Sequence, residues 1–313
     1  MSSAIVLVAS GLLVAGLVAY FVFPAHLVKL LVRAARLVTG FRSRSVDVDG
    51  DTWPYLEGGP ESAEIVVLLH GFGGDKDNWP LYARYLRGKY RVIIPDLPGF
   101  GENSRKSGAD YRMAPQAARL HKFVRAMGID RFHIAGNSMG GFLALQYALA
   151  YPSDVITIGL LNSAGVSSTN KSEVELAAAR GENLLVVSSL DEFDKLMNFI
   201  AHKSIPLPGI IKREIGKRAI AEKEFLDPIF WALFESIIDR PLDERLHEIA
   251  APTLIIWGRH DRVIDVSCTE LMTARIPDNH CVVFADAGHI PMLECPAEAA
   301  SAHLDYLNRH CVA

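Results

Sequence analysis

The sequence predicts an α/β protein with a mostly parallel central sheet flanked by helices, and three observations support this. Short apolar runs rich in β-branched residues recur along the chain and are typical of strands buried on both faces. Helical stretches separate several of these runs, which indicates βαβ units. The chain has 313 residues, of which 50% are hydrophobic and 22% charged, so it is long enough for a large folded domain with an insertion and too apolar for disorder.

The first element is an uncharged run of 20 residues, 4–23. A helix of that length covers about 30 Å, the thickness of a bilayer's hydrocarbon core. No basic residue precedes the run, and the segment after it continues as a helix, which favours an uncleaved membrane anchor over a secretory signal peptide or a buried core helix. Gly11, Ala15 and Ala19 would let two such helices approach closely, so a homodimer through this helix is a further hypothesis.

A basic stem follows the apolar run. His26, Lys29, Arg33 and Arg36 recur at helical spacing and share one face. Residues 1–45 carry a charge of +5 within a chain of net charge −4, so the rest of the chain carries −9. The stem suits anionic lipid headgroups, with an ordinary solvated helix face as the alternative, and the acidic body does not favour nucleic acid. Taken literally, the positive-inside rule places the body in the cytoplasm.

The elements of the core follow in order after residue 45. A hairpin over 46–57 turns at Gly50 and Asp51 and opens the sheet. Buried strands are expected at Glu64–Leu69, Tyr90–Ile94, Phe132–Ala135, Val155–Leu160, Thr253–Trp257 and His280–Phe284. Helices are expected at 76–87, 115–127, 139–150 and 296–310. The core therefore comprises 46–166 and 251–313, after a membrane and juxtamembrane helix over 1–45.

The interval 167–250 breaks this alternation, because it has helical patterns and no convincing strand. The patterns lie at Glu173–Arg180, Leu190–Ala201, Gly209–Glu224 and Pro228–Ile238. Helices inserted between two strands predict a cap over the sheet edge, and Pro206 and Pro208 mark a bend within it.

A nucleophile motif joins one strand to the helix after it. Gly136-Asn137-Ser138-Met139-Gly140 has the order strand, G-x-S-x-G, helix that a nucleophile elbow requires. The chain reverses so sharply at such a serine that side chains two residues away would clash, and glycines remove that clash. Ser138 is therefore the candidate nucleophile, near the positive end of the following helix.

A serine hydroxyl needs a base, and the base needs a carboxylate partner. His289 lies in a loop after the last strand and is the candidate base, because in this order the base comes last. Asp261, in the loop after the strand at 253–257, is the candidate acid, with Asp265 as the nearest rival and Asp286 too close to His289 in the chain. Among the other late histidines, His303 and His310 lie on the terminal helix and are interpreted as surface residues. His280, which opens a strand, and His260, which precedes the acid, are interpreted as structural.

A glycine-rich loop, His70–Gly74, follows the strand at 64–69. Its backbone can approach a substrate carbonyl, and the N–H groups of Phe72 and Met139 are expected to form an oxyanion hole. His70 is expected to brace this loop beside the substrate rather than to transfer protons, and Asp96 is interpreted as structural.

The four cysteines show neither a CxxC motif nor a metal-ligand spacing, and we interpret them as structural thiols, with disulfides as the alternative. No metal or cofactor is predicted. The cysteines are Cys268, Cys281, Cys295 and Cys311.

Five ordered segments, HGFGG, DLPGFG, GNSMGG, GRHDRV and GHIPMLECP, together resemble the α/β-hydrolase superfamily over residues 62–313. With the anchor, the chain is similar to single-pass monoacylglycerol lipases and to bacterial membrane-anchored phospholipases A. The resemblance implies the α/β-hydrolase fold, a helical cap, acyl-ester lipid substrates and a Ser138, Asp261, His289 triad. For the phospholipases it also implies a periplasmic domain, against the charge rule.

We therefore expect a membrane-anchored serine ester hydrolase that cleaves acyl esters of glycerolipids through an acyl-enzyme. A carbon–carbon bond hydrolase of ring-fission products, in which GNSMGG also occurs, and a non-catalytic receptor with this fold are the alternatives. The anchor disfavours the first, and the complete set of candidate residues disfavours the second. Apolar cap residues are candidates for acyl-chain binding, with ordinary packing as the alternative: Phe199, Leu207, Ile211, Phe225, Phe230 and Leu233.

Overall fold

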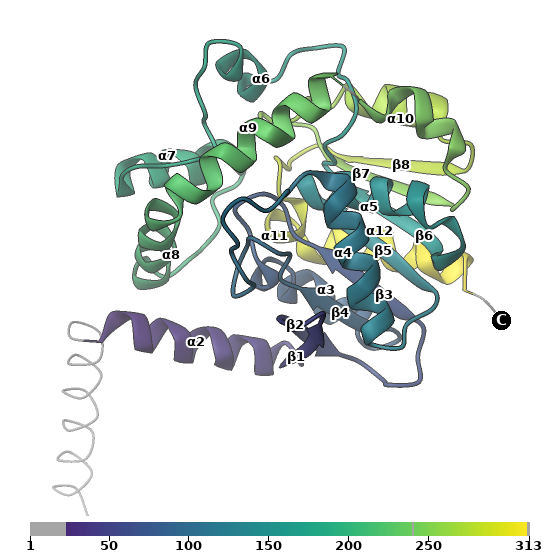
Figure 1. Ribbon diagram of the computed structural model, residues 1–313, viewed down its shortest axis with the longest axis horizontal. Coiled ribbons are helices and arrows are strands. Elements are labelled where there is room, and N and C mark those ends of the chain that lie inside the picture. Colours follow the sequence, from purple (N-terminus) through teal and green to yellow (C-terminus); the bar gives the residue numbers. More distant parts are fainter. Residues whose placement is uncertain (1–22, 240, 312–313) are drawn as a thin grey trace, which may run out of the picture.

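A single twisted sheet forms the centre of the computed structural model, which describes residues 23–239 and 241–311 (Figure 1). Its strand order is β1-β2-β4-β3-β5-β6-β7-β8. The hairpin β1–β2 pairs antiparallel and joins β4 antiparallel, whereas β4, β3 and the remaining strands pair parallel. The strands are β1 Arg42–Val48, β2 Asp51–Gly58, β3 Ile65–Leu69, β4 Arg91–Pro95, β5 Phe132–Asn137, β6 Val155–Leu161, β7 Thr253–Gly258 and β8 Asn279–Phe284. The predicted α/β class and every predicted strand are confirmed.

The hairpin turn explains how β1 leads into β2. Asp49 and Gly50 have φ values of +55° and +83°, the left-handed region that a tight hairpin turn needs and that glycine adopts without strain. The turn lies one residue earlier than the predicted Gly50–Asp51 pair, because Asp51 already belongs to β2.

The register of the parallel strands brings their carboxyl ends to one edge. Leu69 of β3 pairs with Gly136 of β5, and Asn137 pairs with Leu161 of β6. In an open parallel sheet, the loops at these ends form the ligand-binding crevice. The loops that carry the candidate residues therefore converge at one edge of the sheet.

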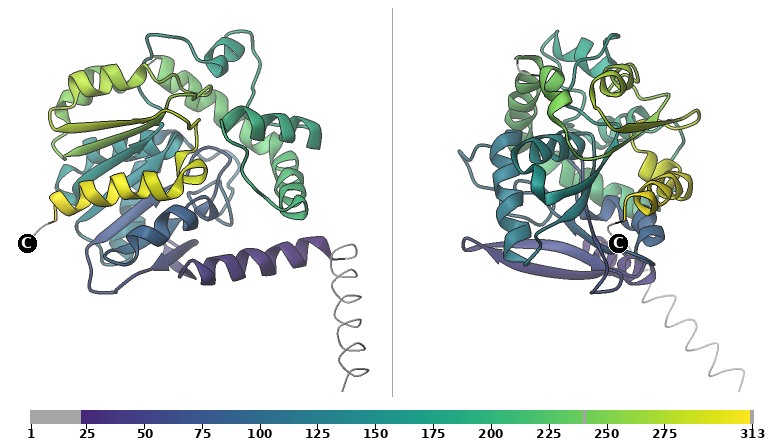
Figure 2. Two further views of the ribbon diagram at one scale, coloured as in Figure 1. Left: turned by 180° about the vertical axis from the view of Figure 1, so that it is seen from behind. Right: turned by 90° about the vertical axis from the view of Figure 1, so that its right-hand side faces the viewer.

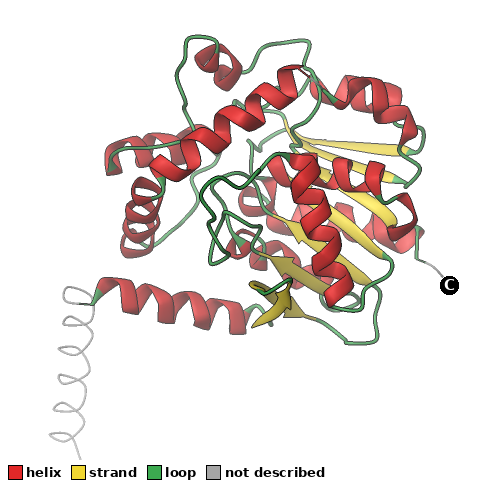
Figure 3. Cartoon of the chain, viewed as in Figure 1, coloured by secondary structure: helices red, strands yellow, loops and turns green. Residues whose placement is uncertain are grey.

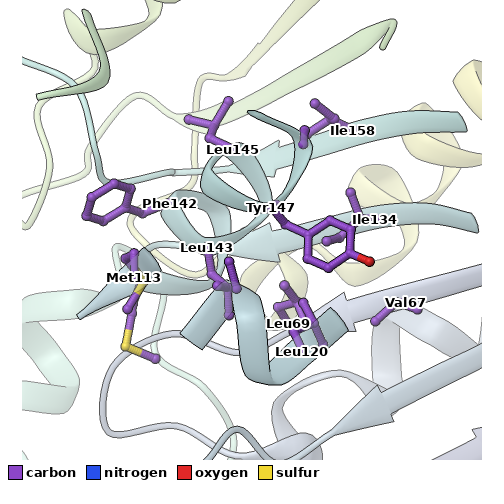
Figure 4. Packing of buried hydrophobic residues seen from close by; sticks show 14 of the residues in the cluster. Val67, Leu69, Met113, Leu120, Ile134, Phe142, Leu143, Leu145, Tyr147 and Ile158 are labelled. Atoms are coloured by element: carbon purple, nitrogen blue, oxygen red, sulfur yellow. The ribbon is translucent and has the colours of Figure 1, made fainter. Parts of the chain in front are cut away.

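Helices cover both faces of the sheet, as two views from different sides show (Figure 2). On one face, α4 packs against α5, and on the other, α3 packs against α12. Each pair encloses its own apolar cluster, and Figure 4 shows side chains of the first, among them Leu120, Leu143, Val67 and Ile134. The flanking helices are α3 Pro80–Leu86, α4 Met113–Ala126, α5 Met139–Ala150, α10 Cys268–Arg275, α11 Pro291–Glu294 and α12 Pro296–Arg309.

The sequence missed two of these helices. Helices α10 and α11 have eight and four residues and are too short to show a clear apolar period. The stretch 76–87, predicted as one helix, divides into the 3₁₀ turn η1, Lys76–Asn78, and α3, because Pro80 begins a new helix.

The interval between β6 and β7 contains helices and, among its described residues, no strand, as the colouring by element type shows (Figure 3). Ser172 and Ser189 cap the first two helices through their side chains. Helix α9 begins five residues before the predicted Pro228, which the helix accommodates in its interior. The elements are α6 Glu173–Ala178, α7 Leu190–Ile200, α8 Gly209–Ala221, α9 Lys223–Asp239 and the 3₁₀ turn η3, Leu242–Glu248.

Helix α2, Pro24–Val38, runs along the lower side of the molecule in Figure 1 and contacts α8 and β1. The predicted basic face is wrong in one member. Arg36 is buried, because its side chain turns toward the η1 turn, whereas Leu30 and Leu37 are 63% and 67% exposed.

None of the described helices is both long and apolar enough to cross a membrane. The predicted span 4–23, with its ladder of small residues, lies outside the described residues except for Phe23.

All four cysteines are free thiols; Cys268 is buried, whereas Cys311 is exposed. Burial raises the pKa of the Cys295 thiol to about 11, so this side chain stays protonated at neutral pH.

Candidate active site

The turn between β5 and α5 places Ser138 in a strained backbone conformation. Its φ is +55° and its ψ is −117°, which a residue with a side chain rarely adopts. A Cβ on Gly136 would lie 2.2 Å from the carbonyl carbon of Gly140, and one on Gly140 would lie 2.3 Å from the carbonyl oxygen of Leu69. The geometry is therefore that of the predicted elbow, and both glycines are sterically required.

Asp261 and His289 meet at the same edge of the sheet. The Nδ1 of His289 donates to the Oδ2 of Asp261 over 2.8 Å, and both side chains are buried. The Oδ1 of Asp261 accepts from the backbone N–H groups of Val263 and Ile264 at 2.8 and 3.0 Å. This arrangement holds the proton on Nδ1 and leaves Nε2 free to exchange one. Among the described residues, the His289 ring is bonded to Asp261 and not to the Ser138 hydroxyl.

Two buried asparagines, which the sequence interpretation missed, support this pair. Asn162 Nδ2 donates to Asp261 Oδ2 at 2.7 Å and to the Gly288 carbonyl at 3.2 Å. Asn137 Nδ2 donates to the His289 carbonyl at 3.0 Å, which ties the base to the residue beside Ser138. The available signal was position: Asn162 directly follows a buried strand, and Asn137 lies within the serine motif.

The rival carboxylates have other partners. Asp265 Oδ1 accepts from the Ser267 N–H at 2.9 Å at the start of α10, and Asp286 is 75% exposed and lies 3.7 Å from Lys203.

One histidine differs from expectation: His303 is buried under the sheet, with Nδ1 2.6 Å from the Tyr82 hydroxyl. Burial lowers its pKa to about 3, because the charged imidazolium would lose its hydration there.

The loop His70–Gly74 lies beside the elbow, as predicted. The backbone N–H groups of Phe72 and Met139 form no hydrogen bond with any residue that the structure describes, and both residues border the same cavity as Ser138. Two unengaged amides beside a serine are the arrangement that stabilises a developing oxyanion. The Met139 amide is free because the first N–H groups of a helix have no intrahelical partner.

His70 braces this loop. Its Nδ1 donates to the Gly71 carbonyl at 2.8 Å, and its Nε2 accepts from the Leu97 N–H at 3.0 Å. Burial lowers the pKa of His70, which keeps the ring neutral and able to accept from Leu97. His70 is fully buried and does not border the cavity, so it supports the loop rather than contacting a substrate directly. Asp96 is also fully buried and accepts from the Lys76 side chain, consistent with a structural role.

An apolar cavity opens at Ser138 and extends beneath α9 and α6. Phe230 and Leu233 of the predicted acyl-binding set border it, whereas Phe225 packs on Tyr111, with ring centroids 5.5 Å apart, on another face of α9. Phe199, Leu207 and Ile211 do not border it. Phe199 packs against the apolar cluster at the end of α7, and α8, which carries Ile211, contacts α7 and α2. Further residues around the cavity are Phe142, Val174, Leu185, Phe234, Ile237, Ile238, Val263 and Cys268. Within 23–239 and 241–311, no group of His, Cys, Asp and Glu side chains is arranged to hold a metal ion.

The strand order, the elbow and the acid–histidine pair define the α/β-hydrolase class of proteins. The chain belongs to the alpha/beta hydrolase family, whose sequence profile matches residues 66–302.

Three similar proteins indicate where in the family the chain falls. Lipase 1 of Psychrobacter immobilis is 38% identical over 255 residues, covering 80% of this chain and 79% of that protein. A monoacylglycerol lipase of Xenopus laevis is 28% identical over 316 residues, covering 96% and 94%. The crystal structure of a membrane phospholipase A matches with a TM-score of 0.89 and 40% identity, covering 100% of both chains.

Proposed function

We propose that this protein is a membrane-associated serine ester hydrolase that releases fatty acids from glycerolipids through an acyl-enzyme. The observation that carries the proposal is the apolar cavity, which begins at Ser138 and at the free amides of Phe72 and Met139. A site with that lining suits an ester whose acyl chain is long and apolar. The relatives named as lipases and as a phospholipase A support this substrate class.

In the proposed reaction, the Ser138 Oγ attacks the ester carbonyl while the Nε2 of His289 takes the hydroxyl proton. The amides of Phe72 and Met139 stabilise the oxyanion of the tetrahedral intermediate. His289 then protonates the leaving alcohol, a glycerol or lysolipid hydroxyl, and later activates the water that hydrolyses the acyl-enzyme. Asp261 holds the imidazole in its tautomer and stabilises the imidazolium.

The proposal includes three units along the chain. Residues 1–45 contain an anchor and the juxtamembrane helix, although β1 of the sheet already begins at Arg42. The bilayer segment is placed at 4–23, with self-association through its small residues as a subsidiary hypothesis. Residues 46–166 and 251–313 are the hydrolase core, and 167–250 are the cap. The apolar residues exposed on α2 favour a position of this helix at a lipid surface, because Leu37 and Val38 are 67% and 85% exposed.

A labelling experiment tests the nucleophile. We expect a fluorescent phosphonate to label the purified full-length protein and Ser138→Ala to abolish labelling. Ser153→Ala is the matched control, because Ser153 precedes β6 at the opposite edge of the sheet. Labelling that survives Ser138→Ala would disprove the assignment.

A substrate panel tests the chemistry. The full-length protein in mild detergent is expected to release fatty acid from monoacylglycerols, lysophospholipids or phospholipids, and Ser138→Ala to release none. Cleavage of a vinylogous diketone without glycerol-ester hydrolysis would instead support the carbon–carbon bond hydrolase.

A further inference from the structure

The loop that carries Phe72 continues directly into a short turn, Asp75–Asn78, and the two form one hydrogen-bonded unit. The Gly74 N–H donates to the Gly71 carbonyl at 3.1 Å, and the Asp75 N–H donates to the Asn78 side chain at 3.0 Å. The Asp75 carboxylate in turn accepts from the Asp77 N–H at 2.9 Å. A displacement of this turn therefore moves the Phe72 amide.

Helix α2 holds the turn from one side through Arg36. Its Nε and Nη2 donate to the two carboxylate oxygens of Asp77 at 2.7 and 2.6 Å, a bidentate pair. The Nη1 of Arg36 donates to Ser43 in β1 at 2.9 Å. The Arg36 side chain is 9% exposed and that of Asp77 is 28% exposed, so water screens this pair little. The planar guanidinium fixes the geometry of the two parallel bonds.

Helix α8 of the cap holds the same turn from another side through Arg218. Its Nη2 lies 2.7 Å from the Oδ2 of Asp75. Burial opposes ionisation of Asp75, but the Arg218 guanidinium outweighs it and lowers the pKa of the Asp75 carboxyl below its usual value. The pair therefore stays charged at neutral pH.

Lys76, at the centre of the turn, connects it to the loop after β4. Its backbone N–H donates to Asp96 Oδ1 at 2.8 Å, and its Nζ lies 2.9 Å from Glu102. Arg36 also lies 3.8 Å from Glu102. The charges of α2, the turn and the loop after β4 thus form one connected network.

We infer that Arg36 and Arg218 are positioning residues for the oxyanion hole: from α2 and from the cap they fix the turn Asp75–Asn78 and thereby the amide of Phe72. The inference rests on the proposed function, because it assumes that Phe72 binds the oxyanion. Its consequence is that the juxtamembrane helix and the cap, neither of which supplies a reacting group, both control the rate of the chemical step.

The kcat and KM for a short, soluble p-nitrophenyl ester test the positioning role of Arg36. We expect Arg36→Gln and Asp77→Asn each to lower kcat about 10-fold and to leave KM nearly unchanged. A displaced oxyanion donor stabilises the transition state less but does not change the binding of the substrate. Arg36→Lys should give an intermediate kcat, because an ammonium keeps the charge and loses the bidentate geometry. Restoration of part of the kcat in the exchanged pair Arg36→Asp/Asp77→Arg would support a direct interaction.

Matched controls lie on the same helices. Arg33→Gln in α2 should leave kcat unchanged, since Arg33 is exposed and pairs with no residue that the structure describes. Arg218→Gln should lower kcat about 3-fold, because its pair is more exposed and contributes less. Lys217→Gln should have no effect, because Lys217 pairs with Glu214 within α8. Equal kcat values for Arg36→Gln and Arg33→Gln would overturn the inference.

Hydrogen exchange separates this inference from the proposed function. In Arg36→Gln, amides of residues 70–78 should exchange faster, while those of 132–150 should exchange as in the native protein. Unchanged exchange in 70–78 would overturn the inference even if the enzyme is active. If the native protein hydrolyses no ester, the proposed function fails, and faster exchange in 70–78 would then show only that Arg36 holds the turn.

Discussion

The Asp261 carboxylate, in the acid–base half of the candidate site, is held by neutral groups at the edge of the sheet. The turn after the oxyanion loop, His70–Gly74, is instead tied to charged groups from outside the sheet. Asn162 and backbone amides surround the Asp261 carboxylate. Arg36 and Arg218 hold the turn after the oxyanion loop. Neutral buried hydrogen bonds respond little to salt or to the placement of a cap, while ion pairs respond to both. The support of Asp261 and the support of the oxyanion loop can therefore be perturbed independently.

The largest expected effect is in the acid–base half. Asp261→Asn should lower kcat about 10⁴-fold with a small change in KM, because an amide at this position stabilises the wrong tautomer of His289. Hydrolysis of a short p-nitrophenyl ester measures it. Asp265→Asn is the control and should keep near-native kcat, since Asp265 binds the Ser267 N–H instead. A larger loss in Asp265→Asn would assign the acid to that residue.

Substitution of Asn162, which supports the acid–base half, should have the next largest effect on kcat. Asn162→Ala removes a buried donor from Asp261 and should lower kcat about 10- to 100-fold and the free energy of unfolding by about 1–3 kcal/mol. Asn279→Ala is the control, because its side chain also donates to backbone carbonyls, at 2.7 and 3.0 Å, but far from the site. If both variants lose stability and only Asn162→Ala loses kcat, positioning is separated from folding.

The two faces of cap helix α9 should differ in how a substitution affects the hydrolysis of long-chain esters. Leu233→Trp fills part of the cavity and should raise KM about 10-fold for long-chain esters while leaving short esters nearly unaffected, because a few buried methylene groups are then displaced. Phe225→Trp, on another face of α9 against Tyr111, should affect neither. Equal effects on short and long esters would place the acyl chain elsewhere.

The smallest effect concerns pH and the oxyanion half. Burial lowers the pKa of His70 below 6.5, opposed by the nearby Asp96 and Asp75 and reinforced by Lys76. The unfolded chain then binds a proton that the folded one does not, so this contribution to stability is complete above about pH 6.5 and is lost as pH falls toward the lowered pKa. In urea unfolding between pH 7 and pH 4, His70→Asn should therefore show a shallower loss of stability than the native protein. His310→Gln, which is partly exposed, should retain the native slope.

Much of the fold was predictable, because its signals are local. Buried parallel strands are short apolar runs, and each of the six predicted buried strands lies within two residues of its observed bounds, whereas β1 begins four residues before the predicted hairpin. The elbow was predictable for the same reason, since Gly136 and Gly140 are needed by the turn itself. Helices α10 and α11 were missed because eight and four residues are too few to define a period.

The parts that were not predictable depend on contacts between distant segments. The burial of His303 follows from its position opposite Tyr82, 221 residues away. The absence of Phe199, Leu207 and Ile211 from the cavity depends on how α7, α8 and the segment between them pack on distant elements such as α2. No sequence pattern within α7 or α8 predicts how these helices pack.

The sequence by itself determined the candidate chemistry: a serine in an elbow, followed by an acid and then a histidine, each after a strand of a parallel sheet. It could do so because the carboxyl ends of parallel strands meet wherever the sheet forms. Only the tertiary structure decided what holds those groups in place, the neutral asparagines on one side and the arginines of α2 and α8 on the other. Burial and ion pairing depend on which surfaces meet, and those surfaces come from residues as far apart as Arg36, Asp77 and Arg218.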